Sequence, residues 1–98
     1  MCWEGAVPRI EALDIDDHIL DKIESRHGVS FEEAEEACYS EERHVRRGRD
    51  GLYKVFSRTD AGRLLLVVLA DQGRGVWRVV TARDMTSQER RLYRQAGG

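Results

Sequence analysis

Cysteine is scarce in this chain, and its metal-binding side chains are scattered. Only Cys2 and Cys38 occur in 98 residues, whereas a metal-binding pair needs close spacing. The three histidines also lack ligand-like spacing. We therefore predict no structural metal and no cofactor. We interpret the two cysteines as free thiols, with a disulfide between them as the alternative.

Long apolar runs are missing as well. The longest, Leu64–Ala70, has the length of a strand and is too short to cross a bilayer. The opening residues MCWEGAVPRIE contain no basic leader followed by an apolar stretch, so they do not resemble a secretion signal. We therefore expect no membrane partner, and we expect the protein in the cytoplasm.

Charge is abundant but unevenly distributed. Through Glu42 the chain carries 13 acidic and 3 basic residues, and from Arg43 onward it carries 5 acidic and 13 basic residues. The net charge of −2 therefore conceals two halves of opposite sign. Such a distribution predicts one anion-binding face rather than nonspecific adhesion to nucleic acid.

The length allows one small domain with a single modest core. The only proline, Pro8, ends a segment of residues 1–8 that we interpret as a flexible tether. Residues 9–96 then form the domain. A hydrophobic content of 41% beside 35% charged residues is typical of a folded domain.

The acidic half predicts one short strand and two helices. The strand is expected at 9–13. Asp16 or Asp17 can cap a first helix that stops at Gly28. Ser30 and Glu33 then form a capping-box pattern for a second helix.

The basic half predicts strands followed by a closing helix. Strands are expected at 43–47, 52–58, 63–70 and 76–82. Thr86 and Glu89 form a second capping-box pattern, which opens a helix to about Gln95. Short connections require antiparallel neighbours. The sequence therefore predicts an α+β domain with two N-terminal helices, an antiparallel sheet of three to five strands and a C-terminal helix.

Arginine dominates the basic half, where Lys54 is the only lysine. A guanidinium stays charged at physiological pH and can bind two phosphate oxygens at once, which suits it to stabilising the transition state of phosphoryl transfer. The alternative is that the arginines pair with the glutamates of the acidic half. We favour a phosphate site for the group, although for any single arginine ion pairing is the more common role.

Strand alternation constrains which basic side chains share a face. Lys54 and Arg58 have the same parity on their strand. Arg78 and Arg83 have opposite parity, so they line one site only if a bulge or the turn into the last helix re-aims Arg83. We therefore rank Arg83 above Arg78.

The last helix and the first helix supply further candidates. Glu89 and Tyr93 are one turn apart, as are Arg90 and Arg94. Tyr93 either contacts RNA or packs the helix onto the sheet. His27 either transfers a proton or interacts with the carbonyls that end the first helix.

Three segments, RHGVSFEEAEEA, YKVFSRTDAGRLLLVV and RVVTARDMTSQERRLY, occur in this order in the chain. Together they resemble the BrnT family of bacterial toxins over a range from about Ile15 to Tyr93. The most specific part is the arginine strand, the Ala-Arg step and the E-R-R-x-Y pattern of the last helix. The resemblance implies a RelE-like fold.

The resemblance also implies a metal-independent endoribonuclease that cleaves RNA, arrests translation and is neutralised by a ribbon-helix-helix antitoxin. Residue by residue, it points to His27, Arg58, Arg63, Arg83, Glu89, Arg90 and Tyr93. With the residues found from pattern alone, the catalytic candidates are Arg83, Arg58, Tyr93, Glu89 and His27. The RNA-binding candidates are Lys54, Arg63, Arg78, Arg90 and Arg94.

The leading hypothesis is a ribonuclease that acts on messenger RNA, on or off the ribosome. Its arginines hold the scissile phosphate while the ribose 2′-hydroxyl attacks in line, and Arg83 matters most. The first alternative is a noncatalytic module of the same fold that binds RNA or an acidic protein. The second is a DNA-binding autoregulator acting alone, which the absence of a helix-turn-helix pattern disfavours.

Overall fold

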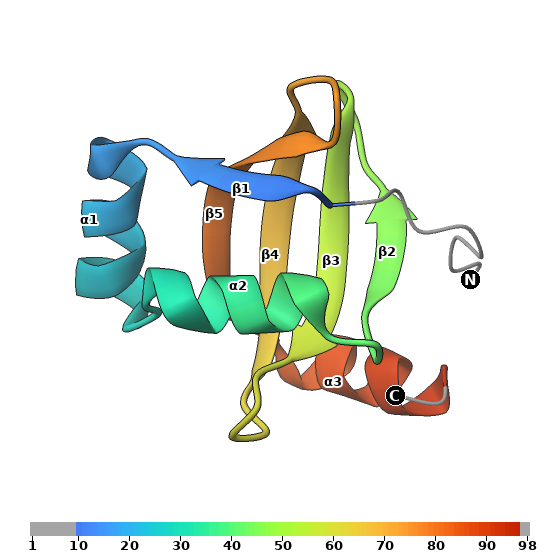
Figure 1. Cartoon of the computed structure of the whole chain (residues 1–98). Helices are drawn as coiled ribbons and strands as arrows, with labels where there is room; N and C mark the ends of the chain where they lie inside the picture. The colour runs from blue at the N-terminus through green and yellow to red at the C-terminus, as the bar shows by residue number, and fades with distance from the viewer. Residues whose placement is uncertain (1–9, 97–98) are drawn as a thin grey trace.

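The computed structural model describes residues 10–96, which form three helices and five strands around one sheet (Figure 1). The order is β1 (Ala12–Ile15), α1 (Asp17–His27), α2 (Phe31–Tyr39), β2 (His44–Arg47), β3 (Leu52–Arg58), β4 (Leu64–Asp71), β5 (Val76–Asp84) and α3 (Ser87–Gln95). The predicted α+β class, with two N-terminal helices and a C-terminal helix, is confirmed. The predicted tether of residues 1–8 and Cys2 lie outside the described residues.

The five strands lie in the order β1-β5-β4-β3-β2. Strands β2 to β5 pair antiparallel, as their short connections require. The first strand departs from the prediction in two ways. It runs from Ala12 to Ile15 rather than over 9–13, and it pairs parallel with β5 at the edge of the sheet. The parallel pairing is possible because the chain passes through α1, α2 and three strands before it returns beside β1.

Side-chain caps determine where the helices begin and end. Asp16 accepts a hydrogen bond from the backbone of His18 and caps α1, which ends at Gly28 in the left-handed conformation (φ 62°). Capping boxes open α2 at Ser30 and α3 at Thr86, as predicted. These local interactions explain why the helix boundaries could be predicted well.

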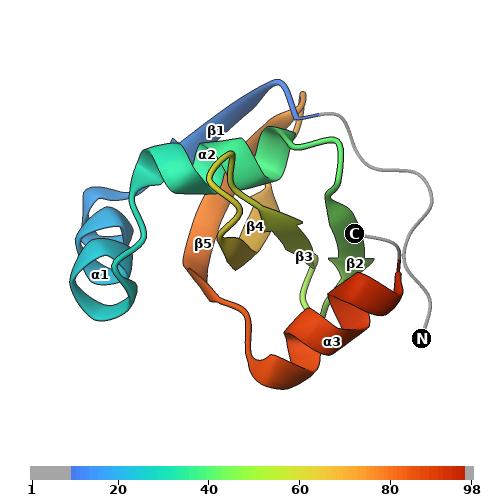
Figure 2. The same ribbon diagram turned by 90° about the horizontal axis from the view of Figure 1, so that it is seen from below.

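Two hydrophobic clusters hold the layers together. Helices α1 and α2 cover one face of the sheet, and α3 covers part of the other (Figure 2). The larger cluster lies under α1 and α2 and includes Ile23, Leu65 and Trp77. The smaller cluster lies under α3 and contains Phe56, Leu66, Met85 and Tyr93. One face of β4 is covered along its length by α1 and α2, and α3 covers the other face near Leu66, so most of its nearly continuous apolar sequence is explained.

Burial makes the thiol of Cys38 inert. The side chain lies in the larger cluster and is inaccessible to solvent. Burial raises its pKa to about 12.

Within residues 10–96, no helix has both the length and the apolar composition needed to span a membrane.

A bulge in β5 changes which residues share a face of the sheet. The register with β4 shifts between Val68 and Leu69, which adds one residue, Val80, to β5. The extra residue reverses the alternation beyond it. Arg78 and Arg83 therefore lie on the same face. On the face that α1 and α2 cover, the buried residues of β5 change from odd to even numbers at the bulge: Trp77, Val79 and Ala82.

Candidate functional site

The sheet face that carries α3 is only partly covered, and its uncovered part is basic. The helix covers the end of this face near Phe56 and Leu66. Beyond it, one row of paired residues runs across β2 to β5 and consists of Arg46, Lys54, Val68 and Thr81. We call the following residues the open face: Arg46, Lys54, Val68, Arg78, Thr81 and Arg83.

The register brings long basic side chains within reach of one ligand. On β4, Leu66 lies opposite Arg83 of β5, and Val68 lies opposite Lys54 of β3. Leu66 and Val68 are two residues apart on the same strand. With strands about 4.8 Å apart and about 3.4 Å per residue, the Cα atoms of Lys54 and Arg83 are roughly 12 Å apart. Their side chains can therefore contact neighbouring phosphates of one strand.

A hollow at the β2–β3 hairpin extends this face. Its lining includes Arg46, Arg49, Lys54 and Val68. Lys54 is exposed, and no carboxylate between residues 10 and 96 pairs with it. Its ammonium group is therefore available to an anion without first breaking an ion pair.

Arg83 forms a two-point ion pair with Glu89 at the edge of the open face. Nη1 and Nη2 of Arg83 lie 2.8 and 3.0 Å from the two carboxylate oxygens. Glu89 also accepts a hydrogen bond from the backbone of Thr86 in the capping box of α3. The hydrogen bonds from Arg83 hold the pKa of Glu89 below its usual value. A guanidinium that can bind a phosphate thus touches an ionised carboxylate that can accept a proton.

Hydrogen-bonded carboxylates predict a loss of stability in acid. The pKa values of Glu33, Asp84 and Glu89 are lowered in the folded state, mainly by hydrogen bonds from Ser30, Arg63 and Arg83 respectively. A lowered pKa contributes stability above the ordinary value, 4.5 for Glu89, and that contribution is lost as the pH falls through the lowered pKa.

Urea denaturation across this range tests the contribution of Glu89. At about pH 7 the variant Glu89→Gln should unfold more easily than the parent, and the difference in the free energy of unfolding should narrow as the pH falls below the ordinary value of 4.5. A difference that stayed constant with pH would contradict a role for the charge of Glu89 in stability.

Two further candidate arginines pair with exposed carboxylates. Arg58 contacts Glu42 at 3.0 Å, and Arg78 contacts Asp14 of β1 at 3.4 Å. Ion pairing with the acidic half, the alternative that the sequence left open, therefore holds for both. Such exposed pairs contribute only about 0–1 kcal/mol, so a phosphate can compete for either arginine.

Arg63 lies outside the open face, although we expected it to bind RNA. Its guanidinium is enclosed by the carboxylates of Glu33 and Asp84 and by the backbone carbonyls of His27 and Gly28. All five N–H donors of an arginine are used by such a set. The contacts identify a structural side chain with no donor left for a ligand.

His27 also lies outside the open face. It ends α1, on the side of the sheet that α1 and α2 cover, and its carbonyl oxygen accepts a hydrogen bond from Arg63 at 3.0 Å. Its imidazole lies near Asp84, whose pKa is lowered chiefly by the hydrogen bonds from Arg63. The structure does not bring His27 to the open face.

Tyr93 adopts the packing role that the sequence left open beside RNA contact. The residue is 1% exposed and lies in the cluster under α3. Its hydroxyl donates to the carbonyl oxygen of Glu42 at 2.9 Å, and its ring meets His44 edge to face. Burial raises the pKa of the hydroxyl, so it stays protonated. These contacts leave Tyr93 no access to a ligand on the open face.

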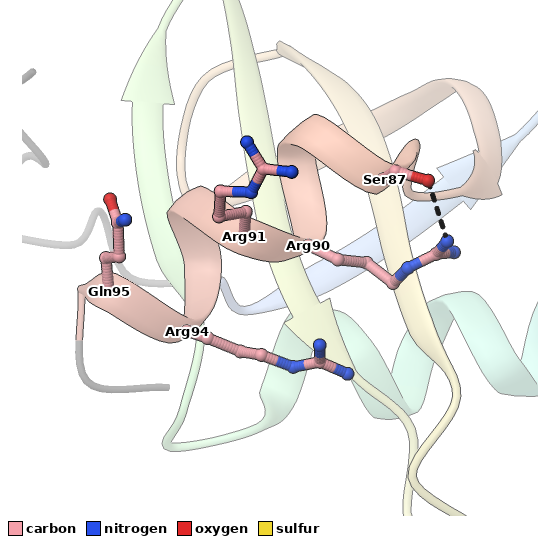
Figure 3. A pocket seen from close by; sticks show the side chains of 5 residues that line it. All are labelled: Ser87, Arg90, Arg91, Arg94 and Gln95. Carbon is pink, nitrogen blue, oxygen red and sulfur yellow. Dashed lines mark hydrogen bonds between the residues drawn. The ribbon is translucent and has the colours of Figure 1, made fainter.

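The outer surface of α3 carries a second group of arginines. Ser87, Arg90, Arg91, Arg94 and Gln95 line a shallow hollow there (Figure 3). Arg90 donates to the carbonyl of Met85 and to the hydroxyl of Ser87, which orients it along the helix. Figure 3 shows Arg90 and Arg94 extending to the same side of the helix. These two RNA-binding candidates therefore form a surface of their own.

Sequence reasoning overlooked Arg46 and Thr81 as members of the open face. Arg46 lies opposite Lys54, and Thr81 lies in the same row on β5. Parity would have assigned Arg46 to this face once the register of β2 was known, but no local signal sets that register.

In residues 10–96, no three His, Cys, Asp or Glu side chains are grouped as metal ligands.

Comparison with known proteins places this geometry in a family. The model of the BrnT family, described as the ribonuclease toxin of type II toxin-antitoxin systems, matches residues 16–89. The crystal structure of the Brucella abortus ribonuclease toxin BrnT is similar in fold, with a TM-score of 0.66 at 13% identity over 78% of this chain and 97% of that one. No match was found among curated proteins. The chain belongs to the BrnT family of ribonuclease toxins of type II toxin-antitoxin systems.

Proposed function

We propose that this protein is a metal-independent endoribonuclease that cleaves RNA at the open face. The observation that carries the proposal is the contact between Arg83 and Glu89 at the edge of a basic, partly uncovered sheet. The family supports a ribonuclease toxin with an antitoxin partner. We propose the cytoplasm as the place of action and a ribbon-helix-helix protein as the antitoxin.

The pair can divide the work of cleavage between a charge stabiliser and a base. The 2′-oxygen of the ribose attacks the adjacent phosphorus, and the bond from phosphorus to the 5′-oxygen breaks, which leaves a 2′,3′-cyclic phosphate and a 5′-hydroxyl. Arg83 binds a nonbridging oxygen and stabilises the charge that develops there. Glu89 accepts the proton of the 2′-hydroxyl, and the leaving 5′-oxygen takes a proton from water.

Binding of RNA must first loosen the ion pair. In the ion pair, Nη1 and Nη2 of Arg83 donate to the two carboxylate oxygens of Glu89. A phosphate oxygen that replaces one carboxylate oxygen keeps the guanidinium satisfied and releases Glu89 for proton transfer. The pair is therefore a resting arrangement that the substrate itself opens.

The open face suits the backbone of an unpaired strand. Lys54, Arg46 and Arg78 supply positive charge along it, and the exposed pair of Arg78 with Asp14 is weak enough for a phosphate to displace. None of Tyr53, Trp77 and Tyr93 lies exposed on this face: the first two pack on the opposite side and the third is buried. Base stacking on these rings therefore contributes nothing, and phosphate contacts dominate binding.

Incubation of the purified protein with single-stranded RNA in chelator tests the proposal. We expect fragments that end in a 2′,3′-cyclic phosphate, and binding that weakens steeply with salt. Salt-sensitive retention of intact RNA would support the noncatalytic binding module instead. Cleavage that requires added divalent metal would contradict the metal-independent mechanism.

A further inference from the structure

Arg63 connects the ends of three elements that are distant in the sequence. Its Nε and Nη2 donate to the two carboxylate oxygens of Asp84, at 2.8 and 3.0 Å, at the end of β5. Its Nη1 contacts the carboxylate of Glu33, in the first turn of α2, at 3.1 Å. The carbonyl oxygens of His27 and Gly28, where α1 ends, accept from Nη2 and Nη1. One guanidinium thus ties α1, α2 and β5 together.

The same network reaches Arg83 through the backbone. The carbonyl oxygen of Asp84 accepts a hydrogen bond from Nη1 of Arg83 at 3.0 Å, beside the ion pair of Arg83 with Glu89. Asp84 therefore contacts both arginines: its side chain binds Arg63, and its carbonyl group orients Arg83. No atom of Arg63 needs to reach the substrate for this effect.

We propose that Arg63 is a positioning residue, which orients Arg83 for catalysis by holding Asp84 at the end of β5. The proposal rests on the proposed function, because it assumes that Arg83 binds the scissile phosphate. Arg63 itself does not contact RNA, and its removal should leave RNA binding almost unchanged.

The geometry explains why this position needs a clamp. Asp84 is the last residue of β5, and only Met85 and Thr86 separate it from α3. Its side chain is about half exposed, at 55%, so packing alone constrains the carboxylate weakly. The two-point contact from Arg63 supplies that constraint, because a planar guanidinium sets both the direction and the distance of a carboxylate.

The two arms of the network can be separated by substitution. Asp84→Asn weakens the arm toward β5, whereas Glu33→Gln weakens the arm toward α2 and keeps an amide that suits the third position of a capping box. Arg63→Lys keeps the charge but cannot bind both carboxylates with two-point geometry. The matched control is Arg26→Ala, which removes one positive charge from an exposed position in the last turn of α1.

Cleavage kinetics and urea denaturation of these variants test the proposal. Because a small misplacement of a catalytic group can cost about 10²-fold, we expect Asp84→Asn and Arg63→Lys to lower kcat by at least about 10-fold with KM little changed. Glu33→Gln should lower stability while its kcat stays near that of the parent. Arg26→Ala should match the parent in both measurements.

Two outcomes would overturn the positioning role. In the first, Asp84→Asn keeps the kcat of the parent while Arg83→Gln is inactive. This result would contradict the positioning role and leave the proposed function intact. The other is a kcat that falls equally in Glu33→Gln and Asp84→Asn in step with stability. If Arg83→Gln itself cleaves RNA normally, the assignment of Arg83 in the proposed function fails instead. If Arg63→Lys does not fold, the comparison of Asp84→Asn with Glu33→Gln still decides.

Discussion

The substitution Arg83→Gln is expected to lower kcat for RNA cleavage by about 10²-fold or more, because it removes a preorganised charge beside the scissile phosphate. Glutamine keeps a hydrogen-bonding amide near Glu89, so the fold should be retained. The measurement is the single-turnover rate on a short single-stranded RNA in chelator. Expression of the variant in a host cell should likewise no longer arrest growth.

A double variant separates catalysis by Arg83 from simple neutralisation of Glu89. In Arg83→Gln the carboxylate of Glu89 loses its two-point partner and stands ionised beside the RNA. If Arg83 only masks this charge, Arg83→Gln/Glu89→Gln should recover cleavage toward the parental rate. We expect no recovery, since the double variant lacks both the phosphate ligand and the proton acceptor. Arg26→Gln, on the exposed side of α1, controls for the loss of one positive charge.

The second large effect is expected at Tyr93, on stability rather than on chemistry. Tyr93→Ala removes a buried aromatic ring from the small cluster under α3, and it should lower the free energy of unfolding by about 3–5 kcal/mol. A domain of this size has a total stability of only about 5–15 kcal/mol. The variant should therefore unfold at a clearly lower temperature than the parent. Urea denaturation followed by circular dichroism measures the change.

Tyr93→Phe distinguishes packing from catalysis at the same position. It keeps the ring against His44 and removes only the hydrogen bond to the carbonyl of Glu42, at a cost of about 1 kcal/mol. Cleavage should remain near the parental rate. A stable Tyr93→Phe protein with cleavage reduced about 10²-fold, the size of effect expected for a catalytic group, would show that the hydroxyl takes part in the reaction.

Helix boundaries and most strands were predictable because their signals are local. The Ser30–Glu33 and Thr86–Glu89 boxes satisfy backbone donors within one turn, so the pattern of residues is the interaction itself. The strand β1 was placed too early and its parallel pairing was missed. That pairing depends on the distant β5, and a four-residue strand with the burial pattern of β1 carries no mark of its partner.

The candidate site was predictable in composition but not in arrangement. Arg83 and Lys54 were identified from residue type and strand parity, and the register does place them on one face. Arg63 and Tyr93 carry side chains equally suited to RNA. Their structural roles follow from partners 21 to 51 positions away in the sequence, such as Asp84 and Glu42.

The amino-acid order alone settles most of the helices and strands of this protein and the separation of acidic from basic residues, because caps, turns and alternation act over a few residues. The fold decides which arginine meets a carboxylate and which faces solvent. The extra residue at Val80 turns Arg78 and Arg83 to the same side, and the meeting of α1, α2 and β5 encloses Arg63. Both outcomes depend on register and on contacts between distant segments, which residue type and local spacing do not specify.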